Sequence, residues 1–173
     1  DALSQYTIPV SGMRTGMHEL EYTVDSSFFK HFEASPIQKG EADIQLYFEK
    51  RTDMYIMVFD FSGTIQTECD RCLEEMELDI SGNEQLLVKF DEEPGEEEAE
   101  VIYIPLGTEE LNIARYIYEF ICLAVPLIKT HDDTDEDCDP EMLAILNSGI
   151  ENEEPDEERT SSVWDALKDF KEK

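Results

Sequence analysis

Strict alternation of apolar and polar residues is the feature that most limits what this chain can fold into. Ala42, Ile44, Leu46 and Phe48 are each followed by a polar or amphipathic residue, and residues 20–24 repeat the pattern. Successive side chains of a strand point to opposite faces of a sheet, so a period of two gathers the apolar side chains on one face. The sequence therefore predicts strands with one buried face and one exposed face.

Further stretches that alternate, or that are rich in β-branched and aromatic residues, extend this prediction. In chain order, the expected strands cover residues 6–10, 20–24, 42–49, 54–67, 76–80, 86–90 and 101–104. Residues 51–53 are expected to form a hairpin turn, and residues 81–83 to turn or bend the chain between two strands. Gly63 is expected at a bend or a bulge, because an isolated glycine in a strand often marks one.

Two helices are expected among the strands. Ser26 or Ser27 can cap a short helix that carries three phenylalanines. Thr108 can cap a longer helix that has two glutamates in its first turn and ends before Pro126. The inward stripe of this longer helix would contain Leu111, Ala114, Ile117, Ile121 and Ala124.

The order of these elements predicts an α+β fold. The expected strands outnumber the helices and lack the alternating rhythm of a parallel α/β sheet. Residues 1–130 are expected to form a mainly antiparallel sheet covered by one main helix. The sheet can be open or can curl toward a barrel. Residues 131–160 are expected to form an acidic loop and linker that is partly disordered, and residues 161–173 a short amphipathic helix.

Negative charge is unevenly distributed along the chain. The sequence has 43 Asp and Glu against 13 Lys and Arg, a formal net charge of −30. Twenty of the acids lie in residues 91–100, 132–141 and 151–158, which contain no lysine or arginine. Runs of like charge are expected to be exposed, either as solubilising loops or as interaction segments. The charge favours a basic protein as partner and disfavours DNA, anionic membranes and a broad RNA-binding surface.

Segments that would direct the chain to a membrane are not expected. The most apolar stretch, residues 116–128, contains Glu119 and Pro126, which predicts a buried element. The first residues do not have the pattern of a signal peptide. The four cysteines include a C-x-x-C pair, which fits a reducing compartment better than a disulfide scaffold. We therefore expect a cytoplasmic protein.

The C-x-x-C pair is the strongest local signal of chemistry. Cys69 and Cys72 can both turn toward one metal ion, and a structural zinc site needs four such donors. His131 and Cys138, which lie in one polar stretch, can complete a set of three cysteines and one histidine. Cys122 is a poorer candidate, because it lies in an apolar helix and is expected in the core.

Structural thiols and a redox pair are the alternatives to a zinc site. A redox pair is usually placed where a helix begins, so that the helix N-terminus lowers a thiol pKa. Strands are expected on both sides of this pair, and acidic residues surround it. Their field is expected to raise the thiol pKa values, which disfavours redox catalysis.

Motifs of common enzymes are missing from the sequence. There is no G-x-G-x-x-G, P-loop, G-x-S-x-G or H-E-x-x-H, so we do not expect an enzyme. Ser161 or Ser162 can cap a last helix, whose apolar side chains either pack on the same chain or enter a groove of a partner. The candidate binding residues of this helix are Trp164, Leu167 and Phe170.

Three segments, taken together, resemble a known family. They are GTIQTECDRCLE at residues 63–74, ICLAVPL at residues 121–127, and DCDP at residues 137–140. The chain is similar, from about residue 20 to residue 146, to the YceD family of bacteria and plastids, also called the large ribosomal RNA subunit accumulation protein family. The resemblance implies a role in accumulation or processing of 23S ribosomal RNA, and hence in biogenesis of the large subunit.

The resemblance also covers the candidate metal ligands. Cys69, Arg71 and Cys72 match the C-x-R-C of the family, and Cys138 matches a cysteine further along the chain. Many relatives have a second cysteine shortly before that one, where this chain has His131 nearby.

Two functions follow from these observations. The first is a non-enzymatic factor whose acidic surfaces bind a basic ribosomal protein or a preribosomal particle. The second is direct, narrow binding of ribosomal RNA near Asp70 and Arg71, with zinc shaping the loop.

Overall fold

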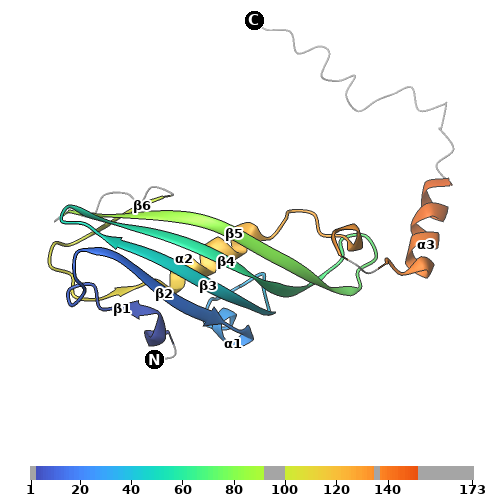
Figure 1. Ribbon diagram of the computed structural model, residues 1–173. Helices are drawn as coiled ribbons and strands as arrows, with labels where there is room; N and C mark the ends of the chain where they lie inside the picture. The colour runs from blue at the N-terminus through green and yellow to red at the C-terminus, as the bar shows by residue number, and fades with distance from the viewer. Residues whose placement is uncertain (1–2, 92–99, 135–136, 152–173) are drawn as a thin grey trace, which may run out of the picture.

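The computed structural model describes residues 3–91, 100–134 and 137–151, and its main element is a long twisted sheet (Figure 1). The strands, in spatial order, are β2 (Gly16–Val24), β3 (Lys39–Lys50), β4 (Met54–Glu68), β5 (Glu75–Phe90) and β6 (Val101–Ile104). All neighbours are antiparallel except β5 and β6, which are parallel. The expected mainly antiparallel sheet is confirmed. The sheet is open, with β2 and β6 at its edges, so it does not close into a barrel.

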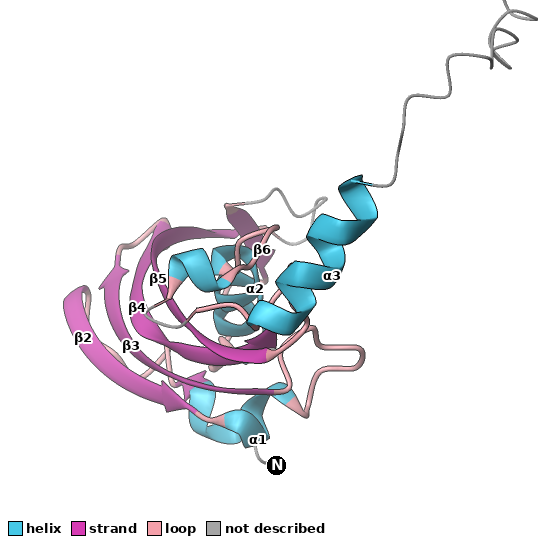
Figure 2. Cartoon of the chain, turned by 90° about the vertical axis from the view of Figure 1, so that its right-hand side faces the viewer, coloured by secondary structure: helices cyan, strands magenta, loops and turns pink. Residues whose placement is uncertain are grey.

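The main helix, α2 (Ala114–Ala124), covers the inner face of the sheet, and the strands curve around it (Figure 2). Phe120 of this helix packs on Phe59 of β4, with ring centroids 5.2 Å apart. The strands β1 (Thr7–Ile8) and β7 (Leu111–Asn112) form a separate two-stranded sheet. The remaining elements are the 3-10 helices η1 (Ser4–Tyr6) and η2 (His131–Asp133) and the helices α1 (Ser26–Phe29) and α3 (Pro140–Glu151).

Burial follows the alternation of the sequence. Every second residue of β3 from Ala42 to Phe48 is buried, and the residues between them lie on the outer face. Inner positions of β4 and β5 and one side of α2 complete a single core. Complete burial of a large apolar side chain contributes about 1.5–3 kcal/mol, so this shared face is the main source of stability.

The start of α2 differs from the expectation. The predicted cap, Thr108, instead donates its hydroxyl to the carbonyl oxygen of Pro105 at 2.7 Å. Leu111 and Asn112 pair with β1, and the Asn112 side chain accepts a hydrogen bond from the N–H of Ala114 at 3.0 Å. Pairing with a strand from the far N-terminus therefore prevents the helix from starting earlier.

The short helix α1 is present where it was expected, with a different cap. Asp25 Oδ1 accepts hydrogen bonds from the N–H groups of Ser27 and Phe28 at 2.8 and 3.2 Å. A carboxylate is a better cap than a serine hydroxyl that lies inside the helix itself. The first predicted strand is also shorter than expected, because Tyr6 belongs to η1 and only Thr7 and Ile8 pair with β7.

The predicted turn at residues 81–83 is wrong, because β5 runs unbroken through it. Gly82 pairs with Phe61 of β4 and lies at an inner position. A Cβ atom at Gly82 would lie 2.5 Å from Cζ of the Phe61 ring, so the ring occupies the space that a side chain would need. Glycine leaves room here for the Phe61 ring and does not end the strand.

Gly63 is likewise explained by a close approach and not by a bulge. It pairs regularly with Ala42 on one side and Ile80 on the other. A Cβ atom at this position would lie 2.1 Å from the carbonyl oxygen of Glu41 and 2.5 Å from Cα of Ala42. Both are backbone atoms, so the tight approach of β3 to β4 depends on this glycine.

The C-terminal part contains a helix where the sequence analysis placed a loop and linker. The helix α3 begins after Asp139, whose side chain accepts a hydrogen bond from the N–H of Glu141 at 2.9 Å (Figure 1). The predicted helix of residues 161–173, with Trp164, Leu167 and Phe170, lies outside the described residues. In the described part of the chain, no helix has both the length and the apolar character needed to cross a membrane.

Candidate metal centre

The four predicted donors meet at one end of the sheet. Cys69 and Cys72 lie in the connection between β4 and β5, His131 opens η2, and Cys138 precedes α3. Their donor atoms all lie within 4.8 Å of one another. The first three side chains are almost completely buried, with exposed fractions of 0, 2 and 3%. The structure therefore brings together a cluster of three cysteines and one histidine that could hold a metal ion.

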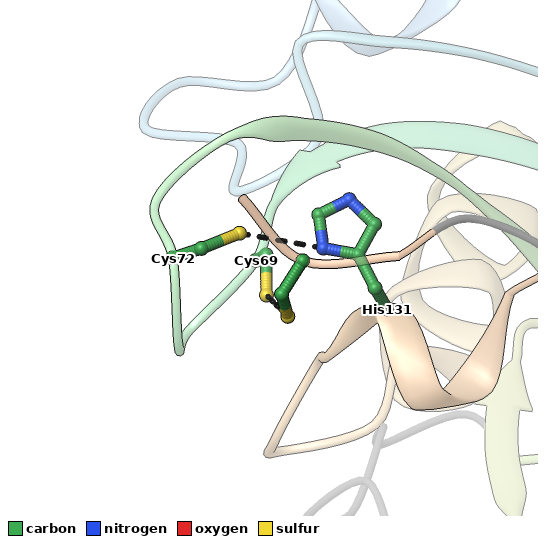
Figure 3. A group of neighbouring side chains, drawn as sticks. Cys69, Cys72 and His131 are labelled. Atoms are coloured by element: carbon green, nitrogen blue, oxygen red, sulfur yellow. Dashed lines mark hydrogen bonds between the residues drawn. The ribbon is translucent and has the colours of Figure 1, made fainter. Parts of the chain in front are cut away.

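Two distances within the cluster are close to those of tetrahedral coordination. The sulfurs of Cys69 and Cys138 are 3.8 Å apart, and the Cys72 sulfur is 3.4 Å from Nδ1 of His131. Figure 3 shows the Cys72 sulfur directed toward the imidazole ring. A tetrahedral zinc ion with Zn–S bonds of about 2.3 Å would hold two sulfurs about 3.8 Å apart and a sulfur and an imidazole nitrogen about 3.6 Å apart. All four cysteines of the chain are free thiols, so no disulfide competes for these donors.

The turn that carries the two cysteines is compact. The N–H of Cys69 donates to the carbonyl oxygen of Glu74 at 2.8 Å, and the N–H of Leu73 donates to that of Cys69 at 2.9 Å. Leu73 adopts a left-handed conformation with φ of 64°. This conformation costs a non-glycine residue about 1–2 kcal/mol, and here it closes the turn so that both sulfurs face the same point.

Two polar pairs fix the histidine segment against the cysteine turn. Asp70 donates its N–H to the carbonyl oxygen of Lys129 and accepts the N–H of Lys129 on its side chain, both at 2.7 Å. Arg71 binds both carboxylate oxygens of Asp132, at 3.1 and 2.6 Å. These pairs flank His131 on both sides in the sequence. The two residues that were predicted to bind a partner, Asp70 and Arg71, therefore contact the same chain.

Electrostatics at Cys69 differ from the expectation. Burial raises the pKa of its thiol, but hydrogen bonds from the backbone of Cys72, Arg71 and His131 outweigh burial and lower the pKa to about 6. The nearby acidic side chains were expected to raise it, but they lie exposed in solvent. The pKa of Cys138 is raised by burial and by hydrogen bonds that its thiol donates to the Cys69 and Cys72 side chains. The backbone around Cys69 thus favours a thiolate, which is the form that binds metal.

Acidic residues of the window 132–141 have structural roles that the sequence analysis did not assign. Asp132 binds Arg71, and Asp133 completes a capping box with Thr130 at the start of η2. Asp139 caps α3. The only sequence signal for the Asp132 pair is that both Arg71 and Asp132 adjoin a candidate ligand. The window 91–100 is described only at Asp91 and Glu100, and most of 151–158 lies outside the described residues.

Removal of the Arg71 side chain is expected to have a small effect on stability. Arg71 and Asp132 have side-chain exposures of 41 and 66%, and such exposed pairs contribute at most about 1 kcal/mol. We expect Arg71→Ala to lower the free energy of unfolding by less than about 1 kcal/mol and to leave the metal content unchanged. Urea denaturation and elemental analysis measure the two quantities. Loss of the metal would show that this pair is required to hold His131 in place.

An open, mainly antiparallel sheet that encloses one helix, with a four-donor cluster at the end of its β4–β5 hairpin, defines a small β-rich protein with a candidate metal site. The family described as Large ribosomal RNA subunit accumulation protein YceD matches residues 57–171. The chain belongs to this family. The matched range begins in β4, later than the resemblance at residue 20, and it includes all four donors. Neither a curated protein nor a solved structure matches the chain.

Proposed function

We propose that the chain is a non-enzymatic factor in accumulation of the large-subunit ribosomal RNA and that it acts by binding basic ribosomal proteins. The family description links the chain to this RNA. The observation that carries the proposal is the formal net charge of −30, which opposes binding to a phosphate backbone and favours a cationic partner. The acidic surface would shield a basic protein until ribosomal RNA replaces it.

The cationic side chains of the described residues support this choice. Several of these cationic side chains form ion pairs with a carboxylate of the same chain, namely Arg51, Arg71, Arg115 and Lys129. Lys50 donates to the backbone oxygens of Val10 and Met13 at 2.6 and 2.8 Å. Charges engaged in this way are less available to displace counterions from RNA.

We propose zinc as the ion of the four-donor cluster, in a structural role. Three thiolates and one imidazole are a typical donor set for structural zinc, and four protein ligands leave no open position for a substrate or water. The burial of Cys69 supports the same conclusion, since a redox-active thiol must be reached from solvent. The zinc would join the β4–β5 hairpin to the segment that follows α2.

Salt-dependent capture tests the proposed partner. The full chain, immobilised, is incubated with the mixed proteins of large ribosomal subunits freed of RNA. We expect basic proteins to be retained at about 0.1 M salt and released toward 1 M, because the Debye length falls from about 10 Å to about 3 Å over this range. Capture that does not weaken with salt, or no capture at low salt, would contradict the proposal.

Direct RNA binding is the second candidate, because Arg71 is partly exposed on the surface next to the metal centre. A gel shift with fragments of 23S ribosomal RNA at low salt tests it, with Arg71→Ala as the matched variant. A complex that forms with the wild-type chain and weakens in this variant favours this function over binding of basic proteins. No shift at low salt excludes it.

A further inference from the structure

The outer face of the sheet carries a continuous acidic groove. Four hollows follow one another across this face, and each shares lining residues with the next. The first and second hollows share Thr23, Asp43 and Ser62. The second and third hollows share Glu41 and Thr64. The third and fourth share Lys39 and Gln66. The first has a volume of about 520 Å³, and the fourth, of about 310 Å³, reaches Asp70 and Lys129 beside the metal centre.

Carboxylates dominate the lining of this groove. Eight acidic residues line the four hollows, against two lysines, and they come from β2, β3, β4, β5 and the cysteine turn. The acids are Glu21, Glu41, Asp43, Asp60, Glu68, Asp70, Glu75 and Glu77. Of the two lysines, Lys129 is paired with Asp70. Acids outnumber lysines in each hollow, and the excess is largest in the first two hollows, which contain no lysine.

The carboxylates do not converge on a metal ion. Among the described residues, the cysteine and histidine cluster is the only group of three or more donors close enough to hold one. The acids are instead spread over neighbouring strands. Glu41 and Asp43 are two positions apart on β3, as Glu75 and Glu77 are on β5. Residues two apart on a strand are about 6.6 Å apart, and an extended peptide presents alternate side chains at the same interval.

We propose that this groove binds an extended, lysine- or arginine-rich segment of a basic protein. The inference rests on the proposed function and locates its binding surface on the sheet, in residues that do not belong to the acidic runs of the sequence. The spacing of the carboxylates matches that of alternate basic side chains. Among the described elements, α2 packs on the opposite face of the sheet and leaves this face open (Figure 2). Ribosomal RNA does not fit, because eight carboxylates repel its phosphates.

Charge-neutral substitution in the middle of the groove tests the proposal. The triple variant Glu41→Gln, Asp43→Asn and Asp60→Asn removes three charges from exposed positions and keeps the shape of the side chains. The matched control, Asp53→Asn with Glu109→Gln and Glu110→Gln, removes three exposed charges outside the groove. The probe is a fluorescent peptide of about ten residues in which lysine and threonine alternate, so that the lysines share one side of an extended chain.

Fluorescence anisotropy gives the affinity of each protein for the peptide. We expect the groove variant to bind about tenfold more weakly than the wild-type chain, and the control variant to bind within about twofold of it. A second peptide of the same composition, with its lysines grouped at one end, should bind the wild-type chain more weakly. Equal losses of affinity in the two variants would show that net charge alone attracts the peptide. This result would overturn the groove proposal.

Failure of the proposed function gives a different result. If the wild-type chain captures no ribosomal protein and does not bind the peptide, basic ribosomal proteins are not its partner. The groove then does not bind a basic segment either. If it captures ribosomal proteins equally well after the groove substitutions, the function stands and the groove proposal is overturned. A 23S RNA fragment whose binding is lost in the groove variant would also overturn it, since RNA would then be the occupant.

Discussion

The substitution Cys69→Ser is expected to abolish stoichiometric metal binding. Cys69 is fully buried, its sulfur is 3.8 Å from that of Cys138, and its backbone surroundings favour the thiolate. A serine hydroxyl does not ionise at neutral pH and is a poor zinc ligand, so three donors would remain. When free zinc exceeds its dissociation constant about a thousandfold, loss of binding lowers the free energy of unfolding by about 4 kcal/mol. Elemental analysis and urea denaturation measure the two effects.

Two variants make this result specific to the cluster. Cys122→Ser changes a partly buried cysteine on α2 outside the cluster and should retain one metal ion per chain. His131→Cys keeps four donors and should also retain the ion, since four thiolates are a common structural zinc site. Wild-type protein that is purified without chelator and contains no metal would rule out the zinc site. Full metal content in Cys69→Ser would show that Cys69 is not a metal ligand.

The substitution Gly63→Ala is expected to destabilise the sheet more than the same exchange at the other glycines whose surroundings are described. The added Cβ would lie 2.1 Å from the Glu41 carbonyl oxygen and 2.5 Å from Cα of Ala42. Both atoms belong to β3, so relief requires β3 and β4 to separate along a pairing that extends from Lys39 to Lys50. We expect a loss of more than about 3 kcal/mol in the free energy of unfolding, measured by urea denaturation followed by circular dichroism.

A glycine with room around it provides the control. A Cβ atom at Gly12 would meet only the carbonyl oxygen of Pro9, at 3.6 Å, which is an ordinary contact. Gly12→Ala should therefore change the free energy of unfolding by less than about 1 kcal/mol. If the Gly63 and Gly12 variants are equally stable, the strands can separate at Gly63 without loss, and the close approach does not limit stability.

The strands could be predicted from sequence because their signal is local. Alternation at Ala42–Phe48 and along residues 76–80 and 86–90 reports which side of the sheet is buried, and the observed burial follows it. The prediction of a turn at residues 81–83 was wrong because Gly82 was interpreted as the end of a strand. Its role depends on the Phe61 ring, which lies on another strand. No local pattern contains that contact.

Two helical features were not predicted, for different reasons. The start of α2 is set by pairing of Leu111 with Ile8, more than a hundred residues earlier in the chain. The helix α3 lies in a stretch whose acidic start indicated a loop, whereas Asp139 acts there as a cap. The first interaction joins distant segments and has no local signal, whereas the Asp139 cap is local and was hidden within an acidic run.

The cluster of four donors was predicted more completely than its surroundings. The chemistry of sulfur and imidazole donors was sufficient to select Cys69, Cys72, His131 and Cys138, and the structure brings their donor atoms together. The contacts of Asp70 with Lys129 and of Arg71 with Asp132 depend on how two distant segments align. The acidic groove depends on strand register, because its acids become neighbours only when β2, β3, β4 and β5 are paired.

The position of the metal ligands along the chain also has a consequence for synthesis. Cys69 and Cys138 are separated by 69 positions, and Cys72 and His131 by 59. At translation rates of about 5–20 residues per second, Cys138 leaves the ribosome about 3–13 s after Cys72. The nascent β-hairpins can pair during this interval, while two thiols wait without their partners. Capture of the proposed zinc ion therefore has to wait until Cys138 has been synthesised, and oxidation of the waiting thiols would be the characteristic failure in maturation.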